Sequence, residues 1–235
     1  MYKLVACDVD GTILVPGQNK IDAKMFARIN NLCNMGIEVV IASGRPYYEL
    51  AELFSPVASL LTFICCDGGV VVRNGRIFFE MPLLINEIFP FLNSVSDMKT
   101  MFYGVSSVFT QIDMIKGHIY KICFEGLSEL QKEKLRQITP PNLYIRYDDN
   151  GLMEFLPVGS DKGIALTFLQ KKLRILPAEC IAFGDNCNDI WMLRSVGLPF
   201  VMKNAKFDLS DITTNSVEDV GKTLDELFFN KRSCL

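Results

Sequence analysis

The chain has 235 residues, of which 49% are hydrophobic and 22% charged, and its formal net charge is −3. This apolar content is enough for one large or two smaller hydrophobic cores. Acidic and basic residues are interspersed, so we expect neither nucleic acid nor a membrane surface as a partner. Asp8 interrupts the N-terminal apolar run early, and no stretch approaches the roughly 20 apolar residues of a membrane span. We therefore expect a cytoplasmic protein that acts on a small molecule.

The first part of the chain alternates strands with helices. Apolar runs predict strands at 3–9, 37–42 and 62–66, separated by helices at 22–35 and about 47–54. A β-hairpin that turns at Asn74-Gly75 follows. The alternation predicts an α/β fold with a parallel sheet.

From about residue 82 the pattern becomes helix, strand, strand, twice over. Helices are predicted at 84–95 and 127–138, and strands near 98–105, 118–124, 142–148 and 152–157. Asp149-Asn150-Gly151 is a strong hairpin signal, so the last two strands should be antiparallel. We expect a separate α+β module inserted at 82–158.

Beyond Pro157 the alternating pattern resumes. It predicts helices at 161–173, 188–195 and 217–229, and strands at 180–183 and 198–202. The two halves of the alternating pattern, 1–81 and 159–235, are therefore expected to form one Rossmann-like core. Proline and glycine near Met81-Pro82 and at 157–159 suit the two crossings between the modules.

Two carboxylates, Asp8 and Asp10, follow the first predicted strand in the run Asp8-Val9-Asp10-Gly11-Thr12. Ligands of open α/β sheets gather where parallel strands end. Two carboxylates this close repel each other unless a cation lies between them, and clustered oxygen ligands suit magnesium. Taken alone, the run equally fits an ordinary Asp-Gly turn.

Three further polar clusters fall at strand ends or helix starts. Ser43-Gly44-Arg45-Pro46 precedes a helix whose free N–H groups can receive a phosphate. Lys162 begins a helix, where its charge opposes the helix dipole and indicates an external anion. We expect the flanking Gly159, Ser160 and Gly163 to leave room for that anion.

The third cluster, residues 184–189, opens another helix with four oxygen-bearing side chains, of which Asp185 is the preferred magnesium ligand opposite Asp8. Each cluster alone could be a helix cap, an Asx turn or a surface lysine. Together they supply a nucleophilic carboxylate, a second acid, a hydroxyl, a lysine and a metal-binding acid pair. This set predicts phosphoryl transfer through an aspartyl phosphate.

In order, DVDGT at 8–12, Ser43 in ASGR, Lys162 in SDKG and GDNCND at 184–189 resemble the four motifs of the haloacid dehalogenase-like phosphohydrolases. The stretch 185–205 is similar to the Cof-type subgroup. The inserted module resembles the type IIB cap of this superfamily. Where relatives have Asn-Gly-Ala after the third strand, this chain has Asp67-Gly68-Gly69.

The resemblance implies a role for each motif residue. Asp8 would be the nucleophile and Asp10 the general acid and base, with Mg²⁺ held by Asp8, the Asp10 backbone carbonyl and Asp185. It further implies that the phosphoryl oxygens are bound by Ser43, Lys162, Asn188 and the N–H groups of Val9 and Gly44, with Thr12 and Asp189 supporting the site from behind. Arg45, Lys121 and Arg146 are candidates for contact with the leaving group.

The function that we favour is a magnesium-dependent phosphatase for a small phosphorylated metabolite, with sugar phosphates as the favoured class. Closure of the cap over the leaving group would exclude bulk water. One alternative is a phosphohexomutase such as phosphomannomutase, because both reactions use an aspartyl phosphate. An alternative from another class is a receiver-like domain or a non-catalytic phosphate sensor.

Overall fold

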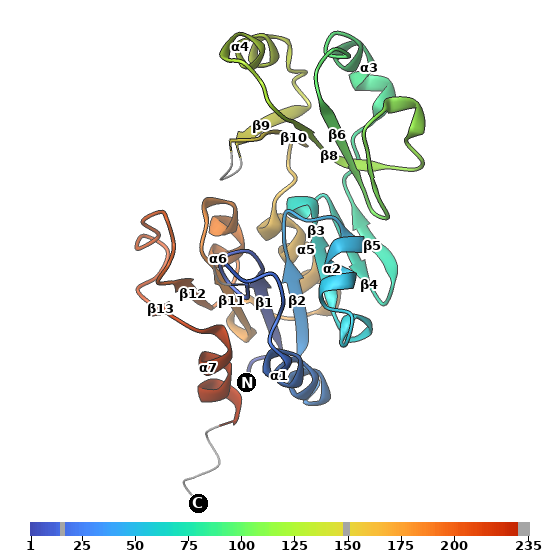
Figure 1. Cartoon of the computed structure of the whole chain (residues 1–235). Helices are drawn as coiled ribbons and strands as arrows, with labels where there is room; N and C mark the ends of the chain where they lie inside the picture. The colour runs from blue at the N-terminus through green and yellow to red at the C-terminus, as the bar shows by residue number, and fades with distance from the viewer. Residues whose placement is uncertain (15–16, 148–150, 230–235) are drawn as a thin grey trace, which may run out of the picture.

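The computed structural model describes residues 1–14, 17–147 and 151–229. It contains an eight-stranded and a five-stranded sheet (Figure 1). We call the larger sheet with its helices the core and the smaller one with its helices the cap, and we keep the boundaries proposed from the sequence, 81/82 and 158/159, for these names. The cap stands over one end of the core, and the N-terminus lies at the opposite end (Figure 1).

The elements follow the predicted order closely. The core comprises β1 (Leu4–Asp8), α1 (Ala23–Asn34), β2 (Glu38–Ala42), α2 (Tyr47–Leu53), β3 (Thr62–Cys65), β4 (Val70–Arg73), β5 (Arg76–Glu80), α5 (Lys162–Leu173), β11 (Cys180–Gly184), α6 (Ile190–Arg194), β12 (Leu198–Met202), β13 (Ser216–Val217) and α7 (Val220–Leu224). The cap comprises α3 (Ile85–Asn93), β6 (Thr100–Gly104), β7 (Val108–Phe109), β8 (Ile119–Phe124), α4 (Glu129–Ile138), β9 (Leu143–Tyr147) and β10 (Met153–Pro157).

The predicted α/β fold class is confirmed, and the differences are local. The two-residue strands β7 and β13 were not predicted, because so short a segment carries no periodicity. The helix predicted at 217–229 is α7 followed by a π-helical turn, Asp225–Phe229. Strands β9 and β10 are antiparallel as predicted, although residues 149 and 150 of the predicted turn lie outside the described residues.

The core sheet has the order β13-β12-β11-β1-β2-β3-β4-β5. Strand β1 pairs in parallel with β2 on one side and with β11 on the other. Strand β2, the next strand in the chain, lies on one side of β1. Strand β11, which lies on the other side, comes only after the cap. This reversal is the topological switch point where ligands of open α/β sheets bind.

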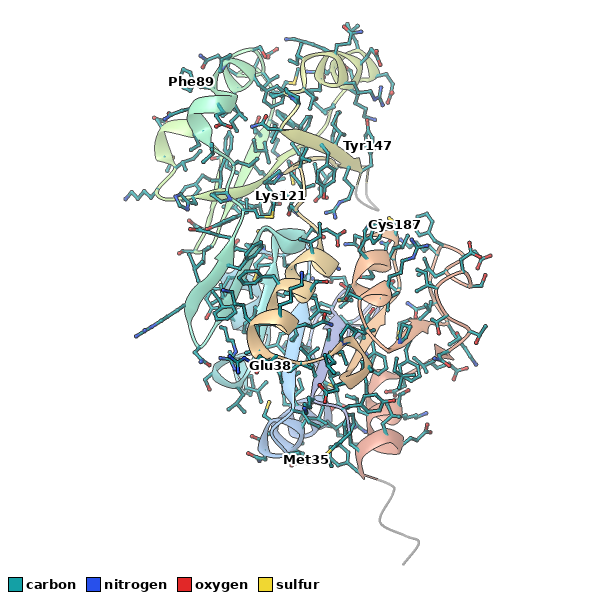
Figure 2. All side chains as sticks on the ribbon, turned by 180° about the vertical axis from the view of Figure 1, so that it is seen from behind. Met35, Glu38, Phe89, Lys121, Tyr147 and Cys187 are labelled. Atoms are coloured by element: carbon teal, nitrogen blue, oxygen red, sulfur yellow. The ribbon has the colours of Figure 1, made fainter. Side chains whose placement is uncertain are left out.

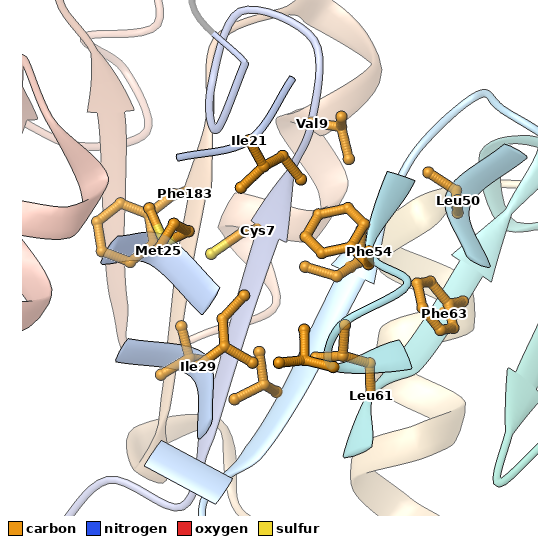
Figure 3. Packing of buried hydrophobic residues seen from close by; sticks show 14 of the residues in the cluster. Cys7, Val9, Ile21, Met25, Ile29, Leu50, Phe54, Leu61, Phe63 and Phe183 are labelled. Atoms are coloured by element: carbon orange, nitrogen blue, oxygen red, sulfur yellow. The ribbon is translucent and has the colours of Figure 1, made fainter. Parts of the chain in front are cut away.

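Alternate residues of β1 face opposite layers of helices. Val5 and Cys7 pack in a cluster with apolar residues of α1, α2 and α7 (Figure 3). Leu4 and Ala6 pack in a second cluster with residues of α5 and α6. Burial on both faces explains why β1 is a continuous apolar run. No helix of the described residues is both long and apolar enough to span a membrane.

The cap sheet has one apolar and one polar face. Ile122 and Phe124 of β8 and Phe155 of β10 pack in a cluster with α3 and α4. Because side chains alternate along a strand, Lys121 in β8 and Glu154 in β10 lie on the other face. That face is turned toward the core, as the position of Lys121 in Figure 2 shows.

Gly163 lies where α5 packs against α6. A Cβ atom at this position would overlap the main chain of Trp191. The expectation that Gly163 leaves room for a phosphate is therefore wrong, because the neighbouring helix fills that space. The close approach of the two helices fixes where α5 begins, and thus where Lys162 stands.

We expect Gly163→Ala to lower the free energy of unfolding by about 1–3 kcal/mol, because α5 and α6 must move apart to admit the methyl group. Urea denaturation measures this change. The control is Lys171→Ala on an exposed position of the same helix, which should stay within about 0.5 kcal/mol of the parent protein. An unchanged midpoint for Gly163→Ala would contradict the close packing.

Candidate active site

The sheet brings the predicted motifs to one edge. Asp8 ends β1, Ser43 follows β2, Asp67 follows β3 and Asp185 follows β11, and these four strands are parallel neighbours. Their side chains line a cavity of about 860 Å³, which cap residues complete. This volume is in the usual range for small-molecule sites.

The Asp8 carboxylate is only half paired. The residue is 5% exposed, and its Oδ1 accepts a hydrogen bond from Lys162 Nζ at 2.7 Å. Its buried Oδ2 has no hydrogen-bond partner among the described residues. Burial and the nearby charge of Asp189 raise the pKa of Asp8 well above its usual range, although Lys162 acts in the opposite direction. A further positive group at this oxygen would stabilise the ionised form.

Lys162 is an internal cation, so the surface-lysine alternative is wrong. It is 1% exposed, and its Nζ also donates to Asp189 Oδ1 at 2.8 Å. Burial alone would lower the pKa of Lys162, but Asp189 and Asp8 raise it above its usual range. Asp161 caps the helix by accepting a hydrogen bond from the Gly163 N–H at 2.6 Å. A capping acid is thus present at the start of this helix together with Lys162.

Asp189 fixes the loop that carries Asp185. Its Oδ2 accepts from the backbone N–H groups of Asp185 and Asn186, both at 3.1 Å. Thr12 Oγ1 donates to Asp185 Oδ1 at 3.3 Å. A Cβ atom at Gly11, whose φ is +96°, would overlap the Asp185 carboxylate. Glycine at this position therefore lets the carboxylate approach the end of β1.

Three carboxylates form a group that fits a divalent cation. Oxygens of Asp8, Asp185 and Asp189 lie within 4.8 Å of one another. Hard oxygen ligands are those that Mg²⁺ prefers. Because Lys162 and two backbone N–H groups already engage both oxygens of Asp189, Asp8 and Asp185 are the side chains that would hold the ion.

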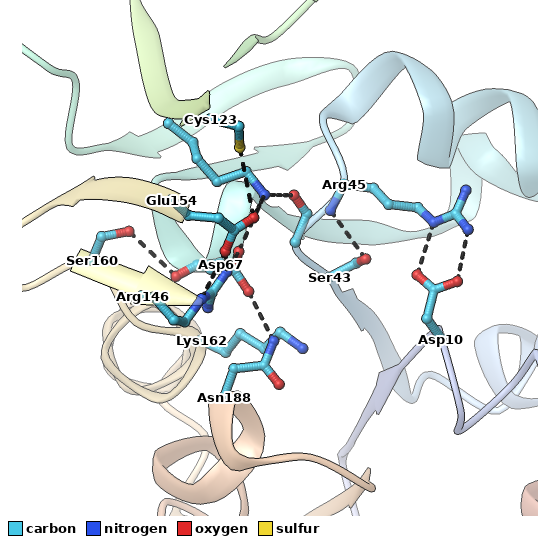
Figure 4. Close-up of polar contacts among 12 residues, drawn as sticks. Asp10, Ser43, Arg45, Asp67, Cys123, Arg146, Glu154, Ser160, Lys162 and Asn188 are labelled. Atoms are coloured by element: carbon cyan, nitrogen blue, oxygen red, sulfur yellow. Dashed lines mark hydrogen bonds and ion pairs between the residues drawn. The ribbon is translucent and has the colours of Figure 1, made fainter. Parts of the chain in front are cut away.

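The Asp10 carboxylate does not join this group. Its side chain is 54% exposed and forms two hydrogen bonds with Arg45, at 2.7 and 2.8 Å (Figure 4). The interpretation that a cation lies between the carboxylates of Asp8 and Asp10 is therefore wrong. Asp10 belongs to the turn after β1 and points across the cavity toward Arg45. It still lines the same cavity as Asp8.

Of the predicted phosphate-binding residues, Ser43, Gly44, Arg45 and Asn188 line the same cavity, whereas Val9 and Lys162 do not. Ser43 Oγ is buried and accepts from the Arg45 N–H at 3.2 Å. Asn188 reaches the cavity from the loop before α6, and Gly44 lies next to Ser43. Val9 is fully buried, and its carbonyl shapes the turn after β1 by accepting from the N–H of Leu14 at 2.8 Å.

Glu154 lines the cavity but was not among the residues predicted for the site. Glu154 lies on the polar face of the cap, where its Oε1 accepts from Lys121 Nζ at 2.8 Å and its Oε2 from Arg146 Nε at 2.8 Å. The available signal was a single charge between Met153 and Phe155 in an apolar strand. Periodicity places such a residue on a face but does not say what the face covers.

Comparison with known proteins gives consistent matches over most of the chain. The profile of the haloacid dehalogenase-like hydrolases matches residues 5–121 and 98–221. The chain is 28% identical over 233 residues to 5-amino-6-(5-phospho-D-ribitylamino)uracil phosphatase YbjI of Escherichia coli (strain K12), which covers 86% of each chain. It is also 28% identical over 235 residues to HMP-PP phosphatase of Escherichia coli (strain 55989 / EAEC), covering 87% of this chain and 85% of that protein.

Solved structures share the fold. A haloacid dehalogenase-like hydrolase from Bacteroides thetaiotaomicron has a TM-score of 0.86 at 20% identity and covers 97% of this chain and 100% of its own. A haloacid dehalogenase-like hydrolase from B. subtilis has a TM-score of 0.81 at 19% identity, with coverage of 96% and 99%. The family profile spans both parts of the core and all four motifs. The chain belongs to the haloacid dehalogenase-like hydrolase family, as a Cof-type member.

Proposed function

We propose that this enzyme is a magnesium-dependent phosphatase, a phosphoric monoester hydrolase that cleaves a small sugar phosphate through an aspartyl-phosphate intermediate. The observation that carries the proposal is the Asp8 carboxylate, held by Lys162 through one oxygen while the other has no partner among the described residues. Family membership and the phosphatase names of the relatives support hydrolysis.

In the first half of the reaction, the Asp8 carboxylate attacks phosphorus, and the bond from phosphorus to the leaving oxygen breaks. Lys162 orients the carboxylate and favours its ionised form. Magnesium, bound by Asp8 and Asp185, would neutralise charge on the phosphoryl group. The Ser43 hydroxyl, the Asn188 amide and the N–H groups of Val9 and Gly44 are our candidates for holding the phosphoryl oxygens.

Asp10 is the proposed general acid and base. It lines the cavity but lies outside the buried carboxylate group, so its side chain can reach a leaving oxygen above Asp8. It would donate a proton to that oxygen and then accept one from the water that hydrolyses the aspartyl phosphate. Turning from Arg45 toward the substrate is the movement that this role requires.

A polar cavity supports a hydroxylated substrate. The cap contributes Lys121, Arg146 and Glu154, and the core contributes Arg45 and Glu49. One relative is named for a phosphorylated ribitylamino compound, which is a polyol phosphate of comparable chemistry. These observations favour a sugar or sugar-alcohol phosphate for this chain.

We expect Asp8→Asn to reduce phosphate release from an aryl phosphate by about 10³-fold or more, because the amide is not a nucleophile. Phosphate release with Mg²⁺ is measured, and circular dichroism checks the fold. Asp113→Asn, at an exposed cap position, is the control and should match the parent. Parent-like turnover by Asp8→Asn would exclude the mechanism, whereas a requirement for a bisphosphorylated sugar would favour the mutase.

Asp10→Asn should slow the steady-state rate by about 10²- to 10⁴-fold. With 4-nitrophenyl phosphate the leaving group needs no proton, so formation of the aspartyl phosphate is spared while its hydrolysis is not. Rapid-quench measurements should therefore show a burst of nitrophenolate followed by slow turnover. A steady-state rate equal to that of the parent would contradict the dual role of Asp10.

Mg²⁺ should stabilise the protein more as pH rises from about 5 to about 8. Burial and Asp189 raise the folded-state pKa of Asp8. Between the unfolded-state pKa and the folded-state pKa, the metal-free protein therefore takes up a proton on folding. Its stability falls as the pH rises through this range. Mg²⁺ competes with that proton. At about 100 times its Kd the ion should contribute about 2.7 kcal/mol.

Thermal unfolding with MgCl₂ or EDTA across this pH range measures the effect. Asp185→Asn should remove most of the Mg²⁺-dependent increase in Tm, because Asp185 is one of the two side chains proposed to hold the ion. An increase that is absent in the parent, or that does not vary with pH, would contradict the proposed site.

A further inference from the structure

Four charged side chains meet where the cap contacts the core, and we call them the Asp67 cluster: Asp67, Lys121, Arg146 and Glu154 (Figure 4). Asp67 comes from the core, directly after β3, and the other three come from β8, β9 and β10 of the cap. All four line the cavity that contains Asp8. The cluster therefore borders the space in which the proposed function places the leaving group.

Strand register builds the cap side of the cluster. Glu154 stands directly opposite Arg146 in β9 and Cys123 in β8. Its two carboxylate oxygens bind different cations, Lys121 at 2.8 Å and Arg146 at 2.8 Å. Cross-strand neighbours on one face of a sheet are within reach of each other, so these charges are held on a rigid scaffold.

A tight turn points Asp67 at the cap. The residue is 1% exposed with a left-handed φ of 54°, and a Cβ atom at the following Gly68 would overlap the main chain of Asp161. The Asp67 carbonyl accepts from Ser160 Oγ at 3.3 Å. Its Oδ1 accepts from Asn188 Nδ2 at 2.9 Å. The turn is thus fixed on several sides.

The other Asp67 oxygen faces both cap cations. Oδ2 lies 3.6 Å from Lys121 Nζ and forms an ion pair with Arg146 Nη2. Burial alone would raise the pKa of Asp67, but Arg146 and Lys121 lower it well below its usual range. Asp67 is therefore a permanent anion that pairs with Arg146 and Lys121. These are the cations to which a second anionic group of a substrate would have to bind.

Lys121, Arg146 and Arg45, three of the cations that line the cavity, are each already paired with carboxylates. The cluster contains two cations and two carboxylates. Arg45, on the core side of the cavity, is paired with Asp10 and lies 3.7 Å from Glu49. An anionic leaving group would have to displace a bound carboxylate and then lie beside it. A hydroxyl group can instead donate to a carboxylate and accept from a cation.

We infer that Asp67 determines the charge class of the substrate, so that the enzyme hydrolyses phosphate esters with an uncharged, hydroxyl-rich leaving group and discriminates against esters that carry a second anionic group. This inference rests on the proposed phosphatase function and adds a residue that sets its specificity. Asp67 acts on the leaving group through its charge and through Arg146 and Lys121.

The test compares kcat/KM for two esters that differ in one group. D-glucitol 6-phosphate ends in a hydroxymethyl group where 6-phospho-D-gluconate has a carboxylate. Phenyl phosphate and 4-carboxyphenyl phosphate form a second pair, in which a carboxylate replaces a ring hydrogen. For the parent protein we expect the uncharged ester of each pair to be preferred by at least about 10-fold.

Asp67→Asn should lower this preference by about 10-fold or more, because it removes one negative charge beside the leaving group and frees a cation. Asparagine has the same size, tolerates a left-handed backbone and can still accept from Asn188. Glu154→Gln removes the second carboxylate from the cap side and should shift the preference in the same direction. The control Glu52→Gln loses a charge at an exposed position outside the cavity and should leave it unchanged.

Using the ratio of two substrates cancels any general loss of activity in a variant. A parent protein that prefers the carboxylate esters, or a preference that moves less than about twofold in both variants, would overturn the role of Asp67 and leave the phosphatase proposal intact. A parent protein that releases phosphate from none of the four esters would instead overturn the phosphatase proposal, and this inference with it.

Discussion

The structure depends on a buried carboxylate at the end of its central strand. Removing Asp8 from water is unfavourable unless cations surround it. Lys162 supplies one, but it is shared with Asp189, and Asp185 adds a third carboxylate nearby. The group is therefore short of positive charge, which is the condition that attracts a divalent cation and an electrophilic phosphorus centre. Packing of α5 on α6 and the backbone contacts of Asp189 hold this arrangement in place.

Hydrogen bonds connect the cap to core segments that carry proposed phosphate-binding residues. Lys121 Nζ donates to the Gly44 carbonyl at 2.9 Å, next to Ser43. The Tyr144 hydroxyl donates to the Ser160 carbonyl at 2.8 Å, two residues before Lys162. Any displacement of the cap would thus act on the segments that position a hydroxyl and a cation of the site. In the function that we propose, these two contacts would couple recognition of the leaving group by the cap to stabilisation of the phosphoryl group by the core.

The cavity contains two electrostatic environments. At the end of β1, acidic side chains outnumber the cation, so this end favours a bound metal ion. At the cap side, Lys121 and Arg146 are matched by Asp67 and Glu154. A balanced, fully hydrogen-bonded environment interacts well with hydroxyl groups and poorly with another anion. For the proposed substrate class, this separation would let one cavity bind a charged phosphoryl group and an uncharged remainder.

The order of the elements, the core with its insertion, and the residues gathered at the edge of the sheet could be predicted from the sequence, because strand and helix periods and the positions of turns are local properties. The directions of the turn side chains and the pairing of the charges became clear only from the folded chain. Asp10 turned to Arg45 instead of Asp8, Gly163 proved to make room for a helix, and Glu154 joined Asp67 across the cap contact through their shared cations. Each of these outcomes depends on segments far apart in the chain, whose distance and register are set by packing.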